Sequence, residues 1–326
     1  MKQLILILWL CTIGIIADTA HNTHRADSHA PIGVMSEHAH KKNEIMVSYR
    51  FMSMQMNDLY NGQKKINDSA VSEMMTPLDM KMNMHMIGAM WGFSNNITLL
   101  GMVNYSDNSM NMSKMNKKET MKTKGLNNLK IGALYTIKKT ESNTFLAHTK
   151  LSIPVGSVDE KTNDKTTPVP YGMQLGSGTY DIELGSTYTK TFNDTSISLQ
   201  GNTTLRLGKN KHDYALGNRY ELNIWGQKNW TNNFSSSLKS TTTIQDNIQG
   251  EHKGITAMTK NMSPLYTTEQ GYILSSIGIG ANYINNSQLL QGSRFAIEYS
   301  IPIFRKTNAT NFTPESTLTF GIQHVL

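Results

Sequence analysis

The sequence is poor in cysteine: Cys11 is the only one among 326 residues. It lies in the apolar run LILILWLCTIGII (4–16), which follows a basic residue and precedes the small residues of ADTA. This order is typical of a secretory signal peptide, so we expect one over 1–20, cleaved near Ala20. The mature chain would then have no cysteine, which excludes disulfides and thiolate metal sites.

Long apolar runs are missing after the first twenty residues. No later segment reaches the roughly 20 consecutive apolar residues that a membrane-spanning helix needs. Only helices and closed barrels satisfy every backbone hydrogen bond in lipid. A mature chain embedded in a membrane must therefore be a closed β-barrel.

Charge is scarce as well, at 17% of residues, and the mean hydropathy is −0.40. Asn, Ser, Thr and Gly replace the Ala, Glu, Lys and Leu that helices favour, which indicates an all-β protein with many turns. The net charge is +7, but the basic residues are dispersed. In an exported chain this predicts a solvated surface and no nucleic-acid partner, while contact with membrane lipid or lipopolysaccharide stays open.

The sequence is rich in period-two alternation. In DMKMNMHMIGAMWG (79–92) every second residue from Met80 to Met86 is methionine. A strand places these residues on one face, whereas a helix would scatter them around its circumference. Similar alternation predicts twelve strands, at 44–56, 80–93, 97–106, 129–138, 145–153, 180–188, 197–206, 220–224, 234–244, 273–283, 294–303 and 318–326.

The connections between these strands alternate in length. Short, turn-forming stretches such as 94–96 and 230–233 separate longer polar ones, at 57–79, 107–125, 155–177, 208–216, 246–270 and 305–315. An even strand count with short periplasmic turns and long outer loops is typical of a bacterial outer-membrane barrel. A soluble β-sandwich also explains alternating strands, but it does not require this loop pattern.

We therefore predict a closed antiparallel transmembrane β-barrel over 43–326 in the bacterial outer membrane, preceded by a His-rich periplasmic segment over 21–42. Most strands have an apolar face for lipid and a polar face for the lumen. The charges expected in the lumen include Asp181, Glu183, Arg206, Glu221, Lys239, Arg294 and Glu298. Tyrosines near strand ends, at Tyr105, Tyr188, Tyr220 and Tyr283, are expected in the interfacial girdles.

Methionine is unusually frequent near the N-terminus: 17 of the 21 fall between Met35 and Met121. In 44–56 the aliphatic face predicts that Met46 and its in-phase neighbours point into the lumen. If 80–93 points the same way, two adjacent strands form a wall of thioethers. Thioethers are soft ligands for Cu(I) or Ag(I), although methionine also simply fills irregular interiors, and we favour packing. The candidate metal-binding methionines are Met52, Met54, Met56, Met80, Met82, Met84 and Met86.

Five of the ten histidines precede the first strand. They are His21, His24, His29, His38 and His40. They can collect Cu²⁺, Zn²⁺ or Ni²⁺ at the periplasmic mouth, with His38 and His40 as the candidate ligands. A flexible terminal tail is the alternative, and we favour it.

Catalytic motifs are weak. A barrel lipase needs a serine and a histidine together near the membrane plane, and the sequence has no His-x-Ser pair. His212 and Asp213 are adjacent in a predicted outer loop, but one such pair is easily chance. We predict no enzymatic activity and no cofactor.

Several motifs together resemble a family of bacterial outer-membrane transporters related to the meta-pathway of phenol degradation proteins. They are HAPIGVM (29–35), SYRFMSMQM (48–56), DMKMNMHMIGAMWG (79–92), LSIPVGS (151–157), MQLGSGTYD (173–181) and LGNRYELNIWG (216–226). They span most of the mature chain in the family's order. The resemblance implies an outer-membrane barrel that passes small molecules, and it implies no catalytic residues.

The leading functional hypothesis is a channel for small solutes, with aromatic compounds as the candidate class. Twelve strands fall between the filled eight-stranded and the open sixteen-stranded barrels, so we expect a narrow lumen partly obstructed by loops such as 57–79 or 155–177. The alternative is an envelope protein that handles copper or silver with the methionine wall and the histidine-rich segment. A third class is a barrel with structural or adhesive duties only. No feature of the sequence predicts an oligomeric state.

Overall fold

The computed structural model of the protein describes residues 26, 28–67, 75–114, 117–255, 263–287 and 290–326. The predicted signal peptide (1–20) and the histidines at 21 and 24 lie outside the described residues. Within the described residues, no helix is long and apolar enough to cross a bilayer.

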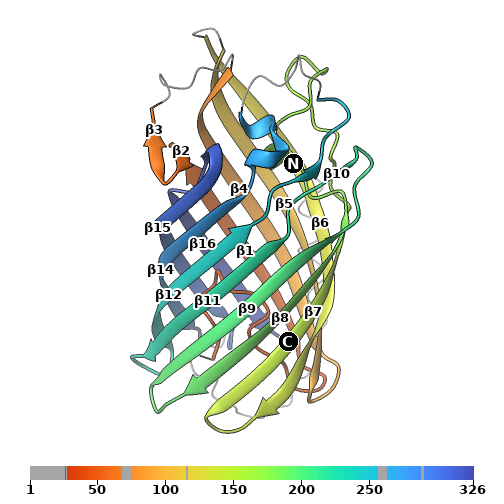
Figure 1. Ribbon diagram of the computed structural model, residues 1–326. Helices are drawn as coiled ribbons and strands as arrows, with labels where there is room; N and C mark the ends of the chain where they lie inside the picture. Colours follow the sequence, from red (N-terminus) through yellow and green to blue (C-terminus); the bar gives the residue numbers. More distant parts are fainter. Residues whose placement is uncertain (1–25, 27, 68–74, 115–116, 256–262, 288–289) are drawn as a thin grey trace.

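One antiparallel sheet contains fourteen strands. Two of them, β2 (Leu59–Gly62) and β3 (Lys64–Ile66), form a short hairpin against β15, so twelve strands remain for the barrel. The barrel closes because β14 pairs with β15 while β1 pairs with both β4 and β16. Figure 1 shows the resulting tilted cylinder. This confirms the predicted fold class.

The barrel strands follow one another around the wall in chain order. They are β1 (Ile45–Met56), β4 (Met75–Gly92), β5 (Ile97–Lys114), β6 (Lys117–Lys139), β7 (Asn143–Ile153), β8 (Tyr180–Thr191), β9 (Thr195–Leu207), β11 (Arg219–Asn229), β12 (Phe234–Gln245), β14 (Tyr272–Ile284), β15 (Arg294–Phe312) and β16 (Ser316–Val325). Each of the twelve predicted segments matches one of these strands, and none extends beyond its strand by more than one residue.

The alternation along each strand separates the two faces of the wall. In β9, Ser198 and Gln200 are buried in the interior, whereas Ile197 and Leu199, which alternate with them, are exposed on the outside. Other outward side chains, such as Ile279, are also apolar and exposed. A continuous apolar exterior around a closed barrel is the surface that a lipid bilayer covers.

Aromatic side chains gather where the strands meet the short turns. Tyr188 pairs with Phe145 across β7 and β8, and Tyr283 pairs with Phe234 across β12 and β14. Trp230 is exposed in the β11–β12 turn. This ring matches the interfacial girdle expected at the periplasmic end of a barrel. The backbone N–H of Leu326 donates to Ile45 O, so the C-terminus lies at the same end.

Three predicted outer loops are largely strand in their described residues. Most of 107–125 belongs to β5 and β6, 305–315 continues β15 to Phe312, and 57–79 contains β2, β3 and the start of β4. Their polar composition predicts loops. Their backbone groups are nevertheless paired: Met110 is opposite Met121, and Met112 is opposite Glu119. These strands extend beyond the apolar band of the barrel, where the outer face does not contact lipid and need not be apolar. The alternation of apolar and polar residues that predicts the other strands is therefore missing here.

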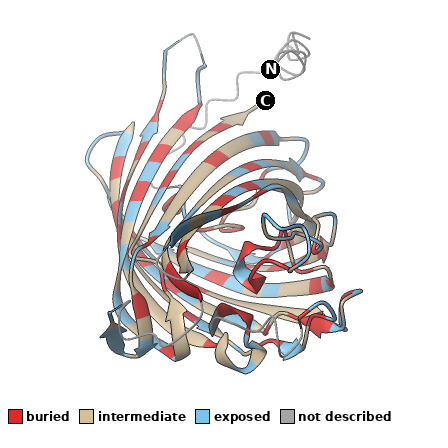
Figure 2. Ribbon diagram, turned by 90° about the horizontal axis from the view of Figure 1, so that it is seen from above, coloured by how far each residue is buried: buried red, intermediate tan, exposed pale blue. Residues whose placement is uncertain are grey.

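Three long outer connections fold over the barrel mouth, and we call their described residues the outer cap. The first, 154–179, includes the 3-10 turn η2 (Tyr171–Met173), and the second, 208–218, includes β10 (Tyr214–Ala215). The third, 246–271, includes β13 (Gln249–Gly250), η3 (Ser263–Leu265) and η4 (Thr267–Glu269). Strands β10 and β13 pair with each other, joining the second and third connections. Seen from above, these segments turn inward within the ring of strands (Figure 2).

Candidate functional site

The methionines of β1 and β4 face the lumen on both strands. Met52 is opposite Met84, Met54 opposite Met82, and Met56 opposite Met80. Met56, Met80 and Met86 are buried, whereas Ile87, next to Met86, is 60% exposed on the outside. The register therefore places all seven candidate methionines on one inner surface, which we call the thioether wall. Its residues are Met52, Met54, Met56, Met80, Met82, Met84 and Met86.

The outer half of the thioether wall is packed against other side chains. Met56 and Met80 belong to a buried apolar cluster with Tyr171, Met173 and Tyr214 of the outer cap. Met54 and Met82 pack against the same cluster. The Thr123 hydroxyl on β6 donates to Met173 O at 2.7 Å, which ties the cap to the strand wall. In this half the thioethers serve as adaptable packing, a common role of methionine.

The inner half of the thioether wall borders a cavity of about 330 Å³ in the middle of the lumen. Met52, Met84 and Met86 line it, together with Met102 of β5 and Met35 of the N-terminal segment. We call this space the central cavity. Its methionine side is apolar, polarisable and accessible to a small molecule.

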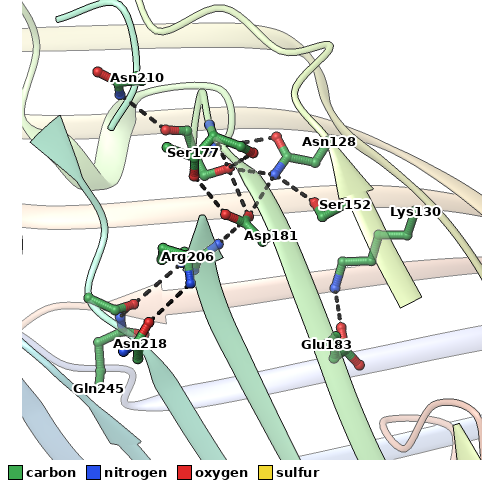
Figure 3. Close-up of polar contacts among 12 residues, drawn as sticks. Asn128, Lys130, Ser152, Ser177, Asp181, Glu183, Arg206, Asn210, Asn218 and Gln245 are labelled. Atoms are coloured by element: carbon green, nitrogen blue, oxygen red, sulfur yellow. Dashed lines mark hydrogen bonds and ion pairs between the residues drawn. The ribbon is translucent and has the colours of Figure 1, made fainter. Parts of the chain in front are cut away.

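The opposite side of the central cavity is charged. Lys130 on β6 donates to Glu183 at 2.9 Å, and Lys150 on β7 contacts the other oxygen of the same carboxylate. Further along, Arg206 contacts Asp181 at 2.5 Å (Figure 3). Five cations and three carboxylates line the cavity, so its lining has an excess of two positive charges; one of the cations, Arg50, lies on β1 beside Met52, and the others lie on the opposite side. These charged residues are Arg50, Lys130, Lys150, Arg206 and Arg219, and Asp181, Glu183 and Glu221.

Asp181 is the most densely bonded member of this charged wall. It is buried and accepts hydrogen bonds from Ser177 Oγ at 2.9 Å and Thr179 Oγ1 at 2.6 Å, besides the contact with Arg206. Asn128 Nδ2 donates to Ser177 Oγ at 2.8 Å (Figure 3). Because Ser177 and Thr179 belong to the outer cap, this network attaches the cap to the wall.

A second cavity of about 350 Å³ lies between the outer cap and the strands. Asn104, Asn128, Lys130 and Arg206 border both this cavity and the central one. The two spaces therefore adjoin along one stretch of wall. Together they form a candidate path from beneath the outer loops to the middle of the barrel.

The outer cap is held by a cluster of aromatic and histidine rings. His212 and His252 stack with their centroids 3.9 Å apart, and His212 Nε2 contacts Asp159 at 2.6 Å. Burial, followed by the neighbouring His212, lowers the pKa of His252. Burial raises the pKa of Tyr214 to about 12, so this phenol stays neutral. The acidic partner of His212 is therefore Asp159 of another cap loop. Its sequence neighbour Asp213 contacts Lys253 instead.

The N-terminal segment from His29 to His40 lies inside the barrel, at its periplasmic end. Gln227 Nε2 donates to His29 O at 2.7 Å, and Gln200 Nε2 donates to Met35 O at 2.9 Å. The N–H of His40 donates to Thr98 Oγ1 at 2.9 Å. These partners come from β5, β9 and β11, so several parts of the wall hold the segment, which we call the lumen segment.

The lumen segment is closely fitted at Gly33. Its N–H donates to Glu298 Oε2 at 3.3 Å, and Glu298 in turn holds Lys239 at 2.6 Å. A Cβ on Gly33 would lie 2.5 Å from Glu298 and 2.6 Å from Lys239. A side chain at position 33 would therefore displace the ends of Glu298 and Lys239 from their positions in this buried ion pair.

The lumen segment also brings its histidines together. The rings of His29 and His38 lie 4.2 Å apart in an edge-to-face arrangement, and His38 is 4.8 Å from His40. Glu37 lies between them and contacts His38 at 2.8 Å. Burial would raise the pKa of Glu37, but His38 and the nearby Arg50 and Arg294 lower it to about 2. The sequence indicated His38 and His40 but missed Glu37.

The strand phase predicted half of the charged wall. The seven charges expected in the lumen include Asp181, Glu183, Arg206 and Glu221, which do line the central cavity. The other four charged residues of the cavity were not among the seven: Arg50, Lys130, Lys150 and Arg219. Arg50 is in phase with Met46 and Met52 on β1, and this phase could have identified it.

Comparison with known proteins supports the fold. No family model matches the chain, and no curated protein matches it by sequence. The structure is similar to the COG4313 outer membrane channel from Pseudomonas putida F1, with a TM-score of 0.64 and 11% identity over 90% of this chain and 99% of that one. The chain has the fold of an outer-membrane channel.

Two further solved structures match the chain with lower scores. A FadL homologue from Pseudomonas aeruginosa gives a TM-score of 0.42 at 10% identity, covering 92% of this chain and 95% of that one. The β domain of the Bordetella autotransporter BrkA gives 0.48 at 11% identity, covering 87% and 99%. At these identities the likeness concerns the architecture, so function must come from the lumen itself.

Proposed function

We propose that the protein is an outer-membrane channel for small solutes that combine an apolar, often aromatic, body with an anionic group. The observation behind this proposal is the two-sided central cavity, with thioethers on one side and an excess of cations on the other. Methionine sulfur makes favourable contacts with aromatic rings. Lysine and arginine attract carboxylates and phenolates. The exterior contacts lipid, with lipopolysaccharide on the outer leaflet.

The size of the central cavity suits this class of solute. At about 330 Å³ it lies at the lower end of the range for sites that bind small molecules. Within the described residues, the outer cap and the lumen segment narrow the barrel at its two ends. The resemblance to transporters related to phenol degradation agrees with aromatic solutes.

Solute flux into proteoliposomes tests the proposal. After the flux into protein-free liposomes is subtracted, we expect benzoate to enter faster than benzyl alcohol, which has the same ring and no charge, and faster than acetate, which has the charge and no ring. In the variant Lys130→Met the preference for benzoate over benzyl alcohol should fall about fivefold. A unit charge about 8 Å away contributes about 1 kcal/mol at an effective dielectric constant of about 40.

The matched control is Lys228→Met, because Lys228 lies at the exposed β11–β12 turn, about half exposed, outside the lumen. Its flux ratios should equal those of the unmodified protein. Equal flux of benzoate, benzyl alcohol and acetate through the unmodified barrel would contradict the proposed selectivity.

A second candidate function is the handling of Cu(I) or Ag(I) by the thioether wall. The register favours it at one place: Met52 and Met84 are direct cross-strand partners and both border the central cavity. The packed methionines Met54 and Met82 are poorer candidates. Silver binding that disappears in Met52→Leu/Met84→Leu, with benzoate flux unchanged, would favour metal handling. Leucine keeps the apolar volume and removes the ligand.

A further inference from the structure

The lumen segment contains a cluster of metal-ligating groups that the solute path does not use. His29, Glu37 and His38 each offer one ligand atom, and these atoms lie within 4.8 Å of one another. The Glu37 carboxylate is 2.8 Å from His38 Nδ1 and 3.9 Å from His29 Nδ1. Ligands of a tetrahedral metal lie about 3.3 Å apart when the bonds are near 2.0 Å. Shifts well under 2 Å would therefore bring all three onto one ion.

The backbone between the ligands is shaped to bring them together. Val34 N donates to Pro31 O at 2.8 Å, which closes a turn after His29. Ser36 has a positive φ of 59°, a conformation uncommon for a residue other than glycine, and it directs the chain back toward its start. Lys150 Nζ donates to Ser36 Oγ at 3.1 Å and holds this bend against the wall. Residues eight and nine positions apart in sequence thus become neighbours.

The cluster is enclosed by the barrel. His29 and Glu37 are buried, and His38 is largely buried. Gln227 fixes the carbonyl of His29 from β11, and Thr98 fixes the N–H of His40 from β5. The ligands are therefore preorganised, and a bound ion would not have to order a flexible tail.

The groups behind His38 match the surroundings of a metal-bound histidine. With Nδ1 of His38 on the metal, its Nε2–H would face His40 Nε2 at 3.1 Å. His40 Nδ1 in turn lies 3.6 Å from Glu44 Oε2, and Lys41 N donates to the same oxygen at 2.9 Å. Metal-bound histidines usually donate their other N–H to such a partner, which orients the ring and raises its basicity.

We propose that His29, Glu37 and His38 bind a divalent transition-metal ion of the Zn²⁺ or Cu²⁺ type inside the periplasmic end of the barrel. Two imidazoles and one carboxylate suit these ions, and water would complete the coordination. His40 and Glu44 are positioning residues. The ion joins the two limbs of the turn and holds the lumen segment in its bend. The proposal is independent of which solute crosses the barrel.

The proposed metal site differs from both metal sites that the sequence predicted, which were the thioether wall and the pair His38 and His40. The thioethers of Met52 and Met84 would take Cu(I) or Ag(I), whereas nitrogen and oxygen ligands favour borderline divalent ions. His38 is a proposed ligand in both accounts. His40 becomes a positioning residue behind His38, and Glu37 and His29 are the two further ligands.

Zinc titration of the full-length barrel in detergent tests the proposal. The protein is first stripped with a chelator, and Zn²⁺ alone is then titrated in competition with a chromophoric chelator. We expect one ion per chain in the variant His21→Asn/His24→Asn, which removes the histidines upstream of the cluster. Adding Glu37→Gln or His29→Asn should weaken binding at least tenfold.

The positioning role of His40 is tested by a separate pair of measurements, the Zn²⁺ affinity and the Co²⁺ spectrum. His40→Phe should weaken Zn²⁺ binding about tenfold, the usual scale for a group behind a ligand, while the stoichiometry stays at one. The visible spectrum of bound Co²⁺ should keep its tetrahedral intensity in this variant and lose it in Glu37→Gln.

The control His85→Gln changes a histidine outside the lumen, which contacts the Tyr49 hydroxyl at 2.8 Å. Its zinc affinity should match that of the unmodified protein. Heat-modifiable gel migration checks that each variant is a folded barrel. The proposal is overturned if the folded Glu37→Gln and His29→Asn variants bind Zn²⁺ as tightly as the parent, or if all binding disappears with His21 and His24.

Discussion

Replacing Gly33 by valine should release the lumen segment from the wall. A Cβ at Gly33 would lie 2.5 Å from Glu298 and 2.6 Å from Lys239, whose ion pair is buried on both sides. To keep the segment in place, the pair must separate. Breaking a buried ion pair costs about 3 to 5 kcal/mol. The clash is absent when the segment is released, so the substitution raises the free energy of the bound state only.

The contacts that hold the segment set the scale of the effect. Glu298 accepts from Gly33 N, and Arg294 donates to the carbonyl of Ala30. Gln227 and Gln200 donate to two further carbonyls. At about 2 kcal/mol for each bond to a charged group and about 1 kcal/mol for each neutral one, these bonds contribute about 6 kcal/mol. A penalty of about 4 kcal/mol would make release roughly a thousandfold more frequent.

Hydrogen exchange measured by mass spectrometry gives the test. The peptide that contains Gly33 should exchange about a thousandfold faster in Gly33→Val, while peptides of β9 and β11 keep their protection. Gly101→Ala is the control, because a Cβ at Gly101 would meet no atom within 4 Å. Equal exchange of the Gly33 peptide in the variant and the parent would refute the account of how the segment is held.

Three further predictions concern the outer cap and its attachment. Tyr214→Ala removes a fully buried ring and should destabilise the cap by about 3 to 5 kcal/mol, seen as faster proteolysis of the outer loops in the folded barrel. Asp181→Asn removes the carboxylate that Arg206 contacts and should lower the midpoint of heat-modifiable migration, whereas an unchanged midpoint would refute a structural role. The pKa of His252 is lowered in the folded cap, so the unfolded loop binds more protons and cap stability must fall as pH drops below about 6.5. After correction for the intrinsic pH dependence of amide exchange, the protection of the loop around His252 should fall from pH 7.5 to pH 5. His252→Phe should remove this fall in protection.

The strands and the direction of most side chains could be predicted from the sequence for a simple reason. Along β9 and over 294–303 of β15, apolar and polar residues largely alternate, and only one phase exposes the apolar set to lipid. Met80 to Met86 were harder, because methionine suits lipid and a lumen alike. The pairing of Met52 with Met84 settles their direction, and this pairing is a property of the assembled sheet.

The lumen segment could not be predicted, because its bonds are made between residues far apart in sequence. Gln227 and Gln200 bind backbone carbonyls of residues near the N-terminus, and no local pattern records such contacts. The cap is similar: Tyr171 and Tyr214 meet at 4.9 Å only after two loops have folded inward. The sequence indicated an obstructed lumen but not the groups that obstruct it.

The proposed path through the central cavity is tested most directly by blocking it. In Met84→Cys the new thiol borders this cavity, and Cys11 lies in the predicted signal peptide, so a bulky methanethiosulfonate reagent would label one known position. Leu238→Cys, 59% exposed on the outside, is the control. We predict that complete labelling of Met84→Cys abolishes benzoate flux into proteoliposomes and that labelling of Leu238→Cys leaves it unchanged. Undiminished flux through fully labelled Met84→Cys would contradict the path.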